Sequence, residues 1–196
     1  VDLEIHSDAK EALQNLTPLV NSNSYETWIR EFRICDKIEY DRVIKEETKP
    51  EKGKIRMGEV VKLVSDMTNG DAIIVTDVGQ NQMTVARYYK FTSPNSWITS
   101  GGMGTMGFGL PAAIGAKLGR PEKNVITFIG DGGFQMTIQE LGTILQYKIP
   151  VKIVILNNNF LGMVRQWQDM FFSKRYAETE LTNPDFVMIA QAFGIP

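Results

Sequence analysis

The sequence predicts an α/β fold, a three-layer sandwich in which a mostly parallel sheet carries helices on both faces. Two apolar runs, residues 125–129 and 151–156, have the length and the branched side chains of buried strands. Between them, Ile138, Leu141 and Ile144 recur at helical spacing, as expected of a crossover helix. Both strands of such a unit end at the same edge of the sheet, where open α/β sheets bind their ligands.

The composition narrows the classes of function. The chain has 196 residues, 43% of them apolar, and a formal net charge of −2, which gives no reason to expect nucleic acid or an anionic membrane as partner. No apolar run approaches the ~20 residues of a membrane span. The single cysteine, Cys35, excludes an internal disulfide and favours a reducing, cytoplasmic location. The single histidine, His6, lies far from any glycine cluster, so an enzyme of this sequence needs a cofactor or a metal.

The first part of the chain is expected to be an appendage. Residues 1–22 contain a short helix-like segment that Pro18 ends, and we interpret them as the tail of a preceding middle domain or as a linker. The main domain then covers residues 23–196 and is interpreted as incomplete at its C-terminal end, where a further strand is expected. Within it, residues 45–54 have no apolar anchor and are predicted to be a solvated linker.

A helix is predicted after Ser24, which is a suitable N-cap. Its apolar face includes Trp28, Phe32 and Cys35. We expect Cys35 to be a small core residue on that face.

The next predicted elements are a helix from about Ile55 to Gly70 and a strand over residues 72–76. The helix has an apolar face that includes Val61, and glycine is a typical helix stop. The strand is apolar throughout, as in a parallel sheet covered on both faces. Residues 77–81 follow it, and the backbone amides of a helix that starts there suit a phosphate.

A glycine-rich segment, residues 101–107, follows a short candidate strand at 97–100 and precedes a helix of small residues that reaches Gly119. Its G-x-G-x-x-G pattern, with Asp131 as the acid, leaves a nicotinamide-dependent dehydrogenase as an alternative. The candidate strand is short and polar, however, and glycines flank the acid on both sides. Both details count against a dinucleotide site. Two further helices are predicted, over residues 161–168 and after residues 182–185.

Polar side chains follow both strands named first. The strand at 125–129 leads into Gly130-Asp131-Gly132-Gly133, and the strand at 151–156 leads into Asn157-Asn158-Asn159. A carboxylate at Asp131 and an amide oxygen at Asn158 are hard ligands that suit Mg²⁺ shared with phosphate oxygens. The glycines let a diphosphate approach the backbone. Asn158 follows Asp131 by 27 positions, and the pattern is the thiamine diphosphate fingerprint.

Three segments closely resemble acetolactate synthase, also called acetohydroxyacid synthase. They are DVGQ at 77–80, ITSGGMGTMGFGLPAA at 98–113 and LGMVRQWQ at 161–168. The resemblance is strong over about residues 70–196. It implies the C-terminal, thiamine diphosphate-binding domain of the catalytic large subunit.

The resemblance implies a role for each matching site residue. Asp131, the Asn158 side chain and the Phe160 carbonyl would bind Mg²⁺, and Met163 and Trp167 would face the substrate pocket. From periodicity alone, those last two residues would be assigned to a core. The implied cofactor-binding residues are Gln80, Asn81, Gly104, Met106, Gly130, Asp131, Gly132, Gly133, Asn158, Leu161, Gly162 and Met163. Among them, Gly104 and Met106 would meet the aminopyrimidine ring.

The implied reaction is carboligation in branched-chain amino acid biosynthesis. The cofactor would attack pyruvate, carbon dioxide would leave, and the two-carbon unit would add to a second pyruvate or to 2-oxobutyrate. The activating glutamate would lie on an amino-terminal domain, so no catalytic residue is assigned in this segment, which is expected to be inactive by itself. FAD would contact mainly the middle domain. A homo-oligomer and a regulatory small subunit are the implied protein partners.

Two positions depart from the family pattern. Asn81 stands where many members have histidine, and Thr84 where tryptophan is frequent. They leave open a related decarboxylase or pyruvate oxidase. A third hypothesis is a non-catalytic interaction module, with Trp167, Phe171 and Phe172 as an exposed docking surface.

Overall fold

The computed structural model describes residues 4–49 and 52–196, which divide into two compact units between Val43 and Ile44. The first unit contains α1 (Ala9–Leu16), the short 3-10 helix η1 (Thr17–Leu19) and α2 (Glu26–Glu39). A π-helical turn, η2 (Tyr40–Ile44), runs across the boundary.

The predicted apolar face of α2 is not buried. Trp28 and Phe32 pack edge to face with ring centroids 4.9 Å apart, yet both side chains are exposed, and so is Cys35. No described residue of this unit is buried, so the prediction that Cys35 is a core residue is wrong. The predicted Ser24 cap is wrong as well. The helix begins after Tyr25, which has a left-handed φ of 43° and makes no side-chain capping hydrogen bond.

The second unit is an alternation of helices and strands. In chain order it contains α3 (Lys45–Glu47), α4 (Met57–Thr68), β1 (Ile73–Thr76), α5 (Gln80–Tyr88), β2 (Trp97–Thr99), α6 (Gly109–Gly119), β3 (Val125–Gly130), α7 (Asp131–Met136), the 3-10 helix η3 (Ile138–Glu140), α8 (Leu141–Tyr147), β4 (Lys152–Leu156), α9 (Gly162–Phe171) and α10 (Phe186–Ala192). The crossover from β3 to β4 is broken after Met136. There Thr137 leaves helical geometry, and its hydroxyl donates to the Gly107 carbonyl at 3.2 Å.

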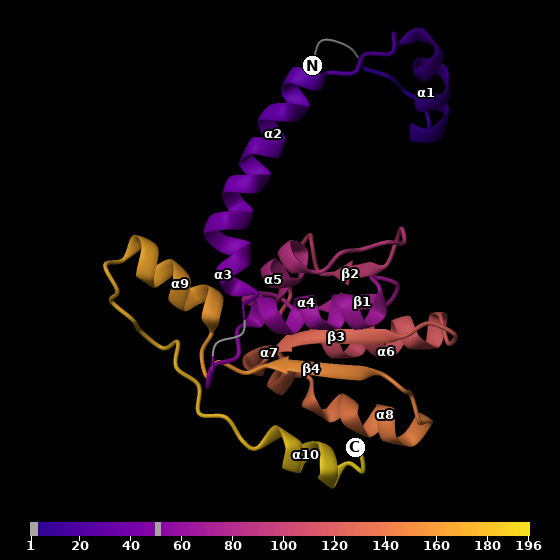
Figure 1. Cartoon of the computed structure of the whole chain (residues 1–196). Coiled ribbons are helices and arrows are strands. Elements are labelled where there is room, and N and C mark those ends of the chain that lie inside the picture. The colour runs from indigo at the N-terminus through magenta and orange to yellow at the C-terminus, as the bar shows by residue number, and fades with distance from the viewer. Residues whose placement is uncertain (1–3, 50–51) are drawn as a thin grey trace. The chain divides into compact units, whose positions relative to one another are not determined.

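The four strands form one parallel sheet in the order β2-β1-β3-β4. Helices α4 and α5 cover one face, and α6, α7 and α8 cover the other (Figure 1). The predicted three-layer α/β fold is confirmed. From β1 the chain runs outward to β2 and then returns past β1 to β3, so the crossovers diverge between β1 and β3. Such a switch point is where open α/β sheets bind ligands.

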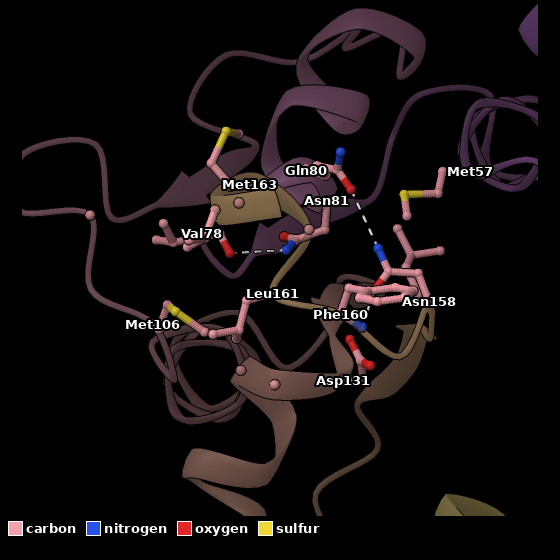
Figure 2. A pocket seen from close by; sticks show the side chains of 18 residues that line it. Met57, Val78, Gln80, Asn81, Met106, Asp131, Asn158, Phe160, Leu161 and Met163 are labelled. Atoms are coloured by element: carbon pink, nitrogen blue, oxygen red, sulfur yellow. Dashed lines mark hydrogen bonds between the residues drawn. The ribbon is translucent and has the colours of Figure 1, made fainter. Parts of the chain in front are cut away.

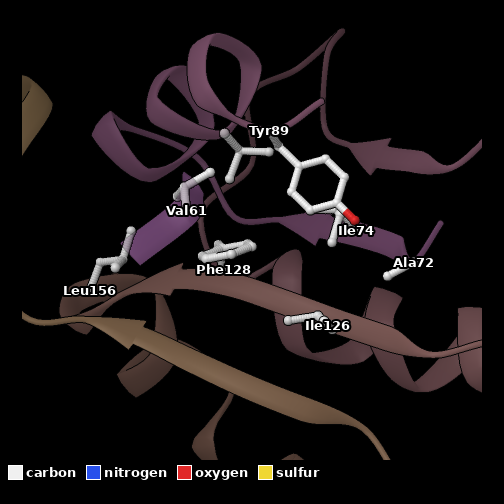
Figure 3. Packing of buried hydrophobic residues seen from close by; sticks show 8 residues of the cluster. Val61, Ala72, Ile74, Tyr89, Ile126, Phe128 and Leu156 are labelled. Atoms are coloured by element: carbon white, nitrogen blue, oxygen red, sulfur yellow. The ribbon is translucent and has the colours of Figure 1, made fainter. Parts of the chain in front are cut away.

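Apolar side chains fill the layer between the sheet and α4 and α5 (Figure 3). Phe128 of β3 and Ile74 of β1 are fully buried there, against Val61 of α4 and Val85 of α5. On the opposite face of the sheet, Leu110 of α6 is buried in a separate apolar cluster with Phe134 of α7 and Leu141 of α8. This packing fixes the strand ends that carry the site. Across the described residues, no helix is both long and apolar enough to cross a membrane.

Candidate cofactor site

A cavity of about 230 Å³ lies at the carboxyl ends of β1, β3 and β4 (Figure 2). Every residue implied above to bind the cofactor lines it: Gln80, Asn81, Gly104, Met106, Gly130, Asp131, Gly132, Gly133, Asn158, Leu161, Gly162 and Met163. Phe160 lines it too, as do Val78 and Gly79 of the turn predicted to suit a phosphate. Met57, Leu156 and Val164 also line it, and the sequence did not single them out as site residues. Trp167 is not among the lining residues and is exposed on α9, so assigning it to a core is wrong.

The turn after β1 supplies one wall of the cavity. Gly79 has a φ of 122°, a conformation that a residue with a side chain rarely adopts, and it lets α5 begin at Gln80. Asn81 is buried, and its Nδ2 donates to the Val78 carbonyl at 3.2 Å. Its Oδ1 is a buried acceptor without a hydrogen-bond partner among the described residues. A ligand that donates a hydrogen bond would satisfy it.

Asp77 ties three segments of the site together. This carboxylate is fully buried and accepts hydrogen bonds from the backbone N–H groups of Gly107 at 3.2 Å and Gly109 at 2.8 Å. It also lies directly against Gly133, where an added Cβ would overlap its Oδ1. The sequence marked Asp77 only as the start of a turn. Its anchoring role was missed because its partners follow it by about 30 residues.

Asp131 opens α7 at the end of β3 and is 2% exposed. Its Oδ2 accepts a hydrogen bond from Asn183 at 2.6 Å, and no cationic side chain of the described chain pairs with it. A buried carboxylate is costly unless a cation or a metal compensates its charge. The burial of Asp131 therefore fits a bound cation.

Asn158 supplies a second oxygen at the end of β4. Its Oδ1 accepts from the Phe160 N–H at 3.0 Å, and its Nδ2 donates to Gln80 Oε1 at 3.3 Å. An amide oxygen has two lone pairs, so one remains for a metal. No three His, Cys, Asp or Glu side chains group into a metal site within residues 4–49 and 52–196. A cation here would use mixed carboxylate, amide and carbonyl oxygens with ligand phosphates, as Mg²⁺ does.

Two glycines keep the cavity open. A Cβ at Gly162 would overlap Gln80 Oε1 and come within 2.9 Å of Asn158 Nδ2. A Cβ at Gly132 would lie 3.1 Å from Leu161 Cδ2 and 3.2 Å from Leu181 Cδ1. Side chains at these two positions would displace the groups that line the cavity.

The start of α9 borders the cavity. Gln166 Oε1 accepts from Gln80 Nε2 at 3.0 Å, which connects α9 with α5. The Arg165 guanidinium lies 3.8 Å above the centre of the Phe160 ring and 4.7 Å from that of Tyr176. The Tyr176 hydroxyl donates to Asp169 at 2.6 Å, and this hydrogen bond raises the pKa of Tyr176. Thr84, the second departure from the family pattern, donates to the Gln80 carbonyl at 2.8 Å.

The structure disfavours a dinucleotide site at the G-x-G-x-x-G segment. That segment follows β2, which is a short edge strand. In dinucleotide-binding folds the corresponding glycines follow a central strand. Here Gly104 instead lines the shared cavity from one side, and Gly107 donates to Asp77.

Comparison with known proteins agrees with a thiamine diphosphate site. The family model for the thiamine pyrophosphate enzyme, C-terminal TPP binding domain, matches residues 77–196. The acetolactate synthase large subunit of Lactococcus lactis subsp. lactis (strain IL1403) is 48% identical over 99% of this chain and 33% of its own length. The acetolactate synthase isozyme 3 large subunit of Escherichia coli (strain K12) is 46% identical over 98% of this chain and 34% of its own length.

A solved structure supports the same family. The Rhodococcus jostii RHA1 thiamine diphosphate-dependent 4-hydroxybenzoylformate decarboxylase matches with a TM-score of 0.68 and 31% identity, over 74% of this chain and 28% of that one. The chain spans about a third of the length of the curated relatives it matches. The predicted resemblance to acetolactate synthase large subunits is confirmed, and the chain belongs to the thiamine pyrophosphate enzymes, whose C-terminal TPP-binding domain it carries.

Proposed function

We propose that this chain binds the diphosphate end of thiamine diphosphate through Mg²⁺, as part of an acetolactate synthase. One observation carries the proposal: the residues implied for cofactor and metal line a single cavity, in which a buried carboxylate has no cationic partner in the described chain. When bound, the cofactor supplies the carbon nucleophile and the electron sink for 2-oxo acid chemistry.

The residues of this chain hold and orient the cofactor. Asp131 Oδ1, Asn158 Oδ1 and the Phe160 carbonyl oxygen hold the metal, while the backbone at Gly132 and Gly133 admits the diphosphate. Gly104 and Met106 support the aminopyrimidine ring from the opposite wall. Met163 narrows the cavity on the substrate side. The structure leaves Trp167 exposed, and we propose that it meets substrate only together with a neighbouring domain or subunit.

The reaction we propose releases carbon dioxide from pyruvate and joins the remaining two-carbon unit to a second pyruvate or to 2-oxobutyrate. An activating glutamate and the FAD contacts would be supplied by other domains, and the chain by itself is expected to be inactive. A homo-oligomer, a regulatory small subunit and a cytoplasmic location complete the proposal. It is supported by the similarity to acetolactate synthase large subunits.

Calorimetric titration of the full-length protein with thiamine diphosphate tests the site. We expect binding in Mg²⁺ and none in EDTA, because the diphosphate is held through the metal. Asp131→Asn keeps the shape of the side chain but removes its charge, and it should weaken binding by at least about tenfold, since ligand charge sets the affinity of oxygen sites for hard cations. Binding that is unchanged by both EDTA and Asp131→Asn would refute the proposal.

A decarboxylase is the second candidate, favoured by the structural similarity to 4-hydroxybenzoylformate decarboxylase. The two activities differ in product, since a decarboxylase releases an aldehyde and a carboligase releases acetolactate. Product analysis after incubation of the full-length enzyme with pyruvate distinguishes them. We expect acetolactate, because the acetolactate synthases are the more similar in sequence.

A further inference from the structure

Asn183 lies in the segment before α10 and contacts both strand-end turns of the site. Its Nδ2 is 2.6 Å from Asp131 Oδ2, 2.9 Å from Asn157 Oδ1 and 3.0 Å from Asn159 Oδ1. One amide group therefore joins the turn after β3 to the turn after β4.

A further hydrogen bond, from Gln135, fixes the orientation of the Asn183 amide. Gln135 Nε2 donates to Asn183 Oδ1 at 2.8 Å, and it also reaches the backbone carbonyl of Asp131 at 3.4 Å. Because a carboxylate can only accept, the NH₂ group of Asn183 must face Asp131. Gln135 stands one turn after Asp131 on α7, so the helix that carries the carboxylate also orients its donor.

Asn183 is held in place by the packing of the segment that follows. Pro184 restricts the backbone after it, and Asp185 caps α10 through hydrogen bonds from Val187 and Met188 at 2.9 and 3.0 Å. Phe186 packs edge to face on Phe134 of α7, with ring centroids 5.4 Å apart. The donor and the carboxylate are thus positioned by one hydrophobic cluster.

We propose that Asn183 is a positioning residue for the metal site, which deepens the proposed function and rests on it. Its amide holds Oδ2 of Asp131 and leaves Oδ1, which makes no hydrogen bond to the described residues, directed to the metal. The NH₂ group has two hydrogens, so Asn157 and Asn159 share the N–H that does not face Asp131, and this shared contact holds the second turn, with Asn158 between them. Partners that orient a metal ligand in this way typically contribute about 10–100-fold to metal affinity.

The test is the affinity of the full-length protein for Mn²⁺, measured by electron paramagnetic resonance at saturating thiamine diphosphate. We expect Asn183→Ala to weaken Mn²⁺ binding by about 10–100-fold. Gln135→Met, which keeps the length of the side chain but removes the donor, should weaken it in the same direction and to a smaller extent. The matched control is Asn124→Ala, an exposed asparagine that accepts from Lys152 at the opposite end of β3.

A second measurement separates positioning from a structural role. Thermal unfolding in EDTA, without cofactor, should show a modest loss of stability in Asn183→Ala, because a buried carboxylate loses its donor. The Mn²⁺ titrations are therefore run well below the unfolding transition of each variant, so that any loss of affinity belongs to the folded protein. If Mn²⁺ affinity is unchanged in both variants while Asp131→Asn lowers it, the role of Asn183 is refuted and the proposed site stands. If Asp131→Asn also leaves Mn²⁺ affinity unchanged, the proposed function fails as well.

Discussion

Replacing Gly133 with alanine is expected to weaken thiamine diphosphate binding by about 100-fold and to destabilise the fold by about 3 kcal/mol. The added Cβ would overlap Oδ1 of Asp77, a fully buried carboxylate whose other contacts are the backbone N–H groups of Gly107 and Gly109. Asp77 cannot move away without losing its hydrogen bonds, because it is fully buried and held by two backbone N–H groups. Relief of the overlap must shift the start of α7, and Asp131 with it. Urea unfolding and calorimetric titration measure the two effects.

The matched control is Gly115→Ala. Gly115 lies inside α6, is exposed, and has nothing within 4 Å of the position that a Cβ would take. Alanine there should be neutral or stabilising by up to about 1 kcal/mol, because it has the higher helix propensity. Equal effects of the two substitutions would show that the contact with Asp77 is not what excludes a side chain at position 133.

Phe128→Ala is expected to lower the free energy of unfolding by about 3–5 kcal/mol. Phe128 is fully buried on β3, in one cluster with Val61 of α4 and Ile74 of β1 (Figure 3). Val85 of α5 belongs to the same cluster. Truncation removes apolar contacts and leaves a cavity between helices and sheet that the two rigid layers cannot close. The loss should appear as a lower urea midpoint with an unchanged denaturant dependence.

Phe172→Ala provides the comparison for Phe128. Phe172 is 50% exposed at the end of α9, and its removal should change the free energy of unfolding by less than about 1 kcal/mol. A loss at Phe128 no greater than at Phe172 would contradict the assignment of Phe128 to the core.

The sequence predicted those parts of the site that local pattern determines. Asp131 follows β3 directly and Asn158 is the second residue after β4, so their positions at one sheet edge follow from the strands themselves. Asp77 and Asn183 contribute through partners that lie 24 to 52 positions away in the chain. No periodicity encodes such a contact, and Asn183 looks like an ordinary turn residue before Pro184.

Helical periodicity also fails to predict burial, because it indicates which face of a helix is apolar but not which element packs against that face. Trp28 and Phe32 recur at helical spacing on α2, and the structure leaves both exposed. Trp167 is a similar case on α9, since the spacing that suggested a core does not bury it. An amphipathic pattern shows that a helix can bury one face, and the neighbour that would cover it is set by long-range packing.

The order of the strands has a consequence for how the cavity forms during folding. Parallel pairing excludes hairpins, and β1 pairs with β3 across 52 positions, as in Ile73 with Val125, but with β2 across only 23, as in Ile74 with Trp97. The longer loop costs more chain entropy to close, so we expect the β1–β3 pair, which frames the cavity, to form last.

Three backbone amides report on these two pairings. The N–H of Ile74 donates to the carbonyl before β2, whereas the N–H groups of Ile73 and Asp77 donate to carbonyls on the β3 side. Pulse-labelled hydrogen exchange during refolding should therefore protect Ile74 first, and simultaneous protection of all three amides would contradict this order. A folding intermediate in which β1 and β3 have not yet paired would contain most of the secondary structure and still lack the cofactor-binding cavity.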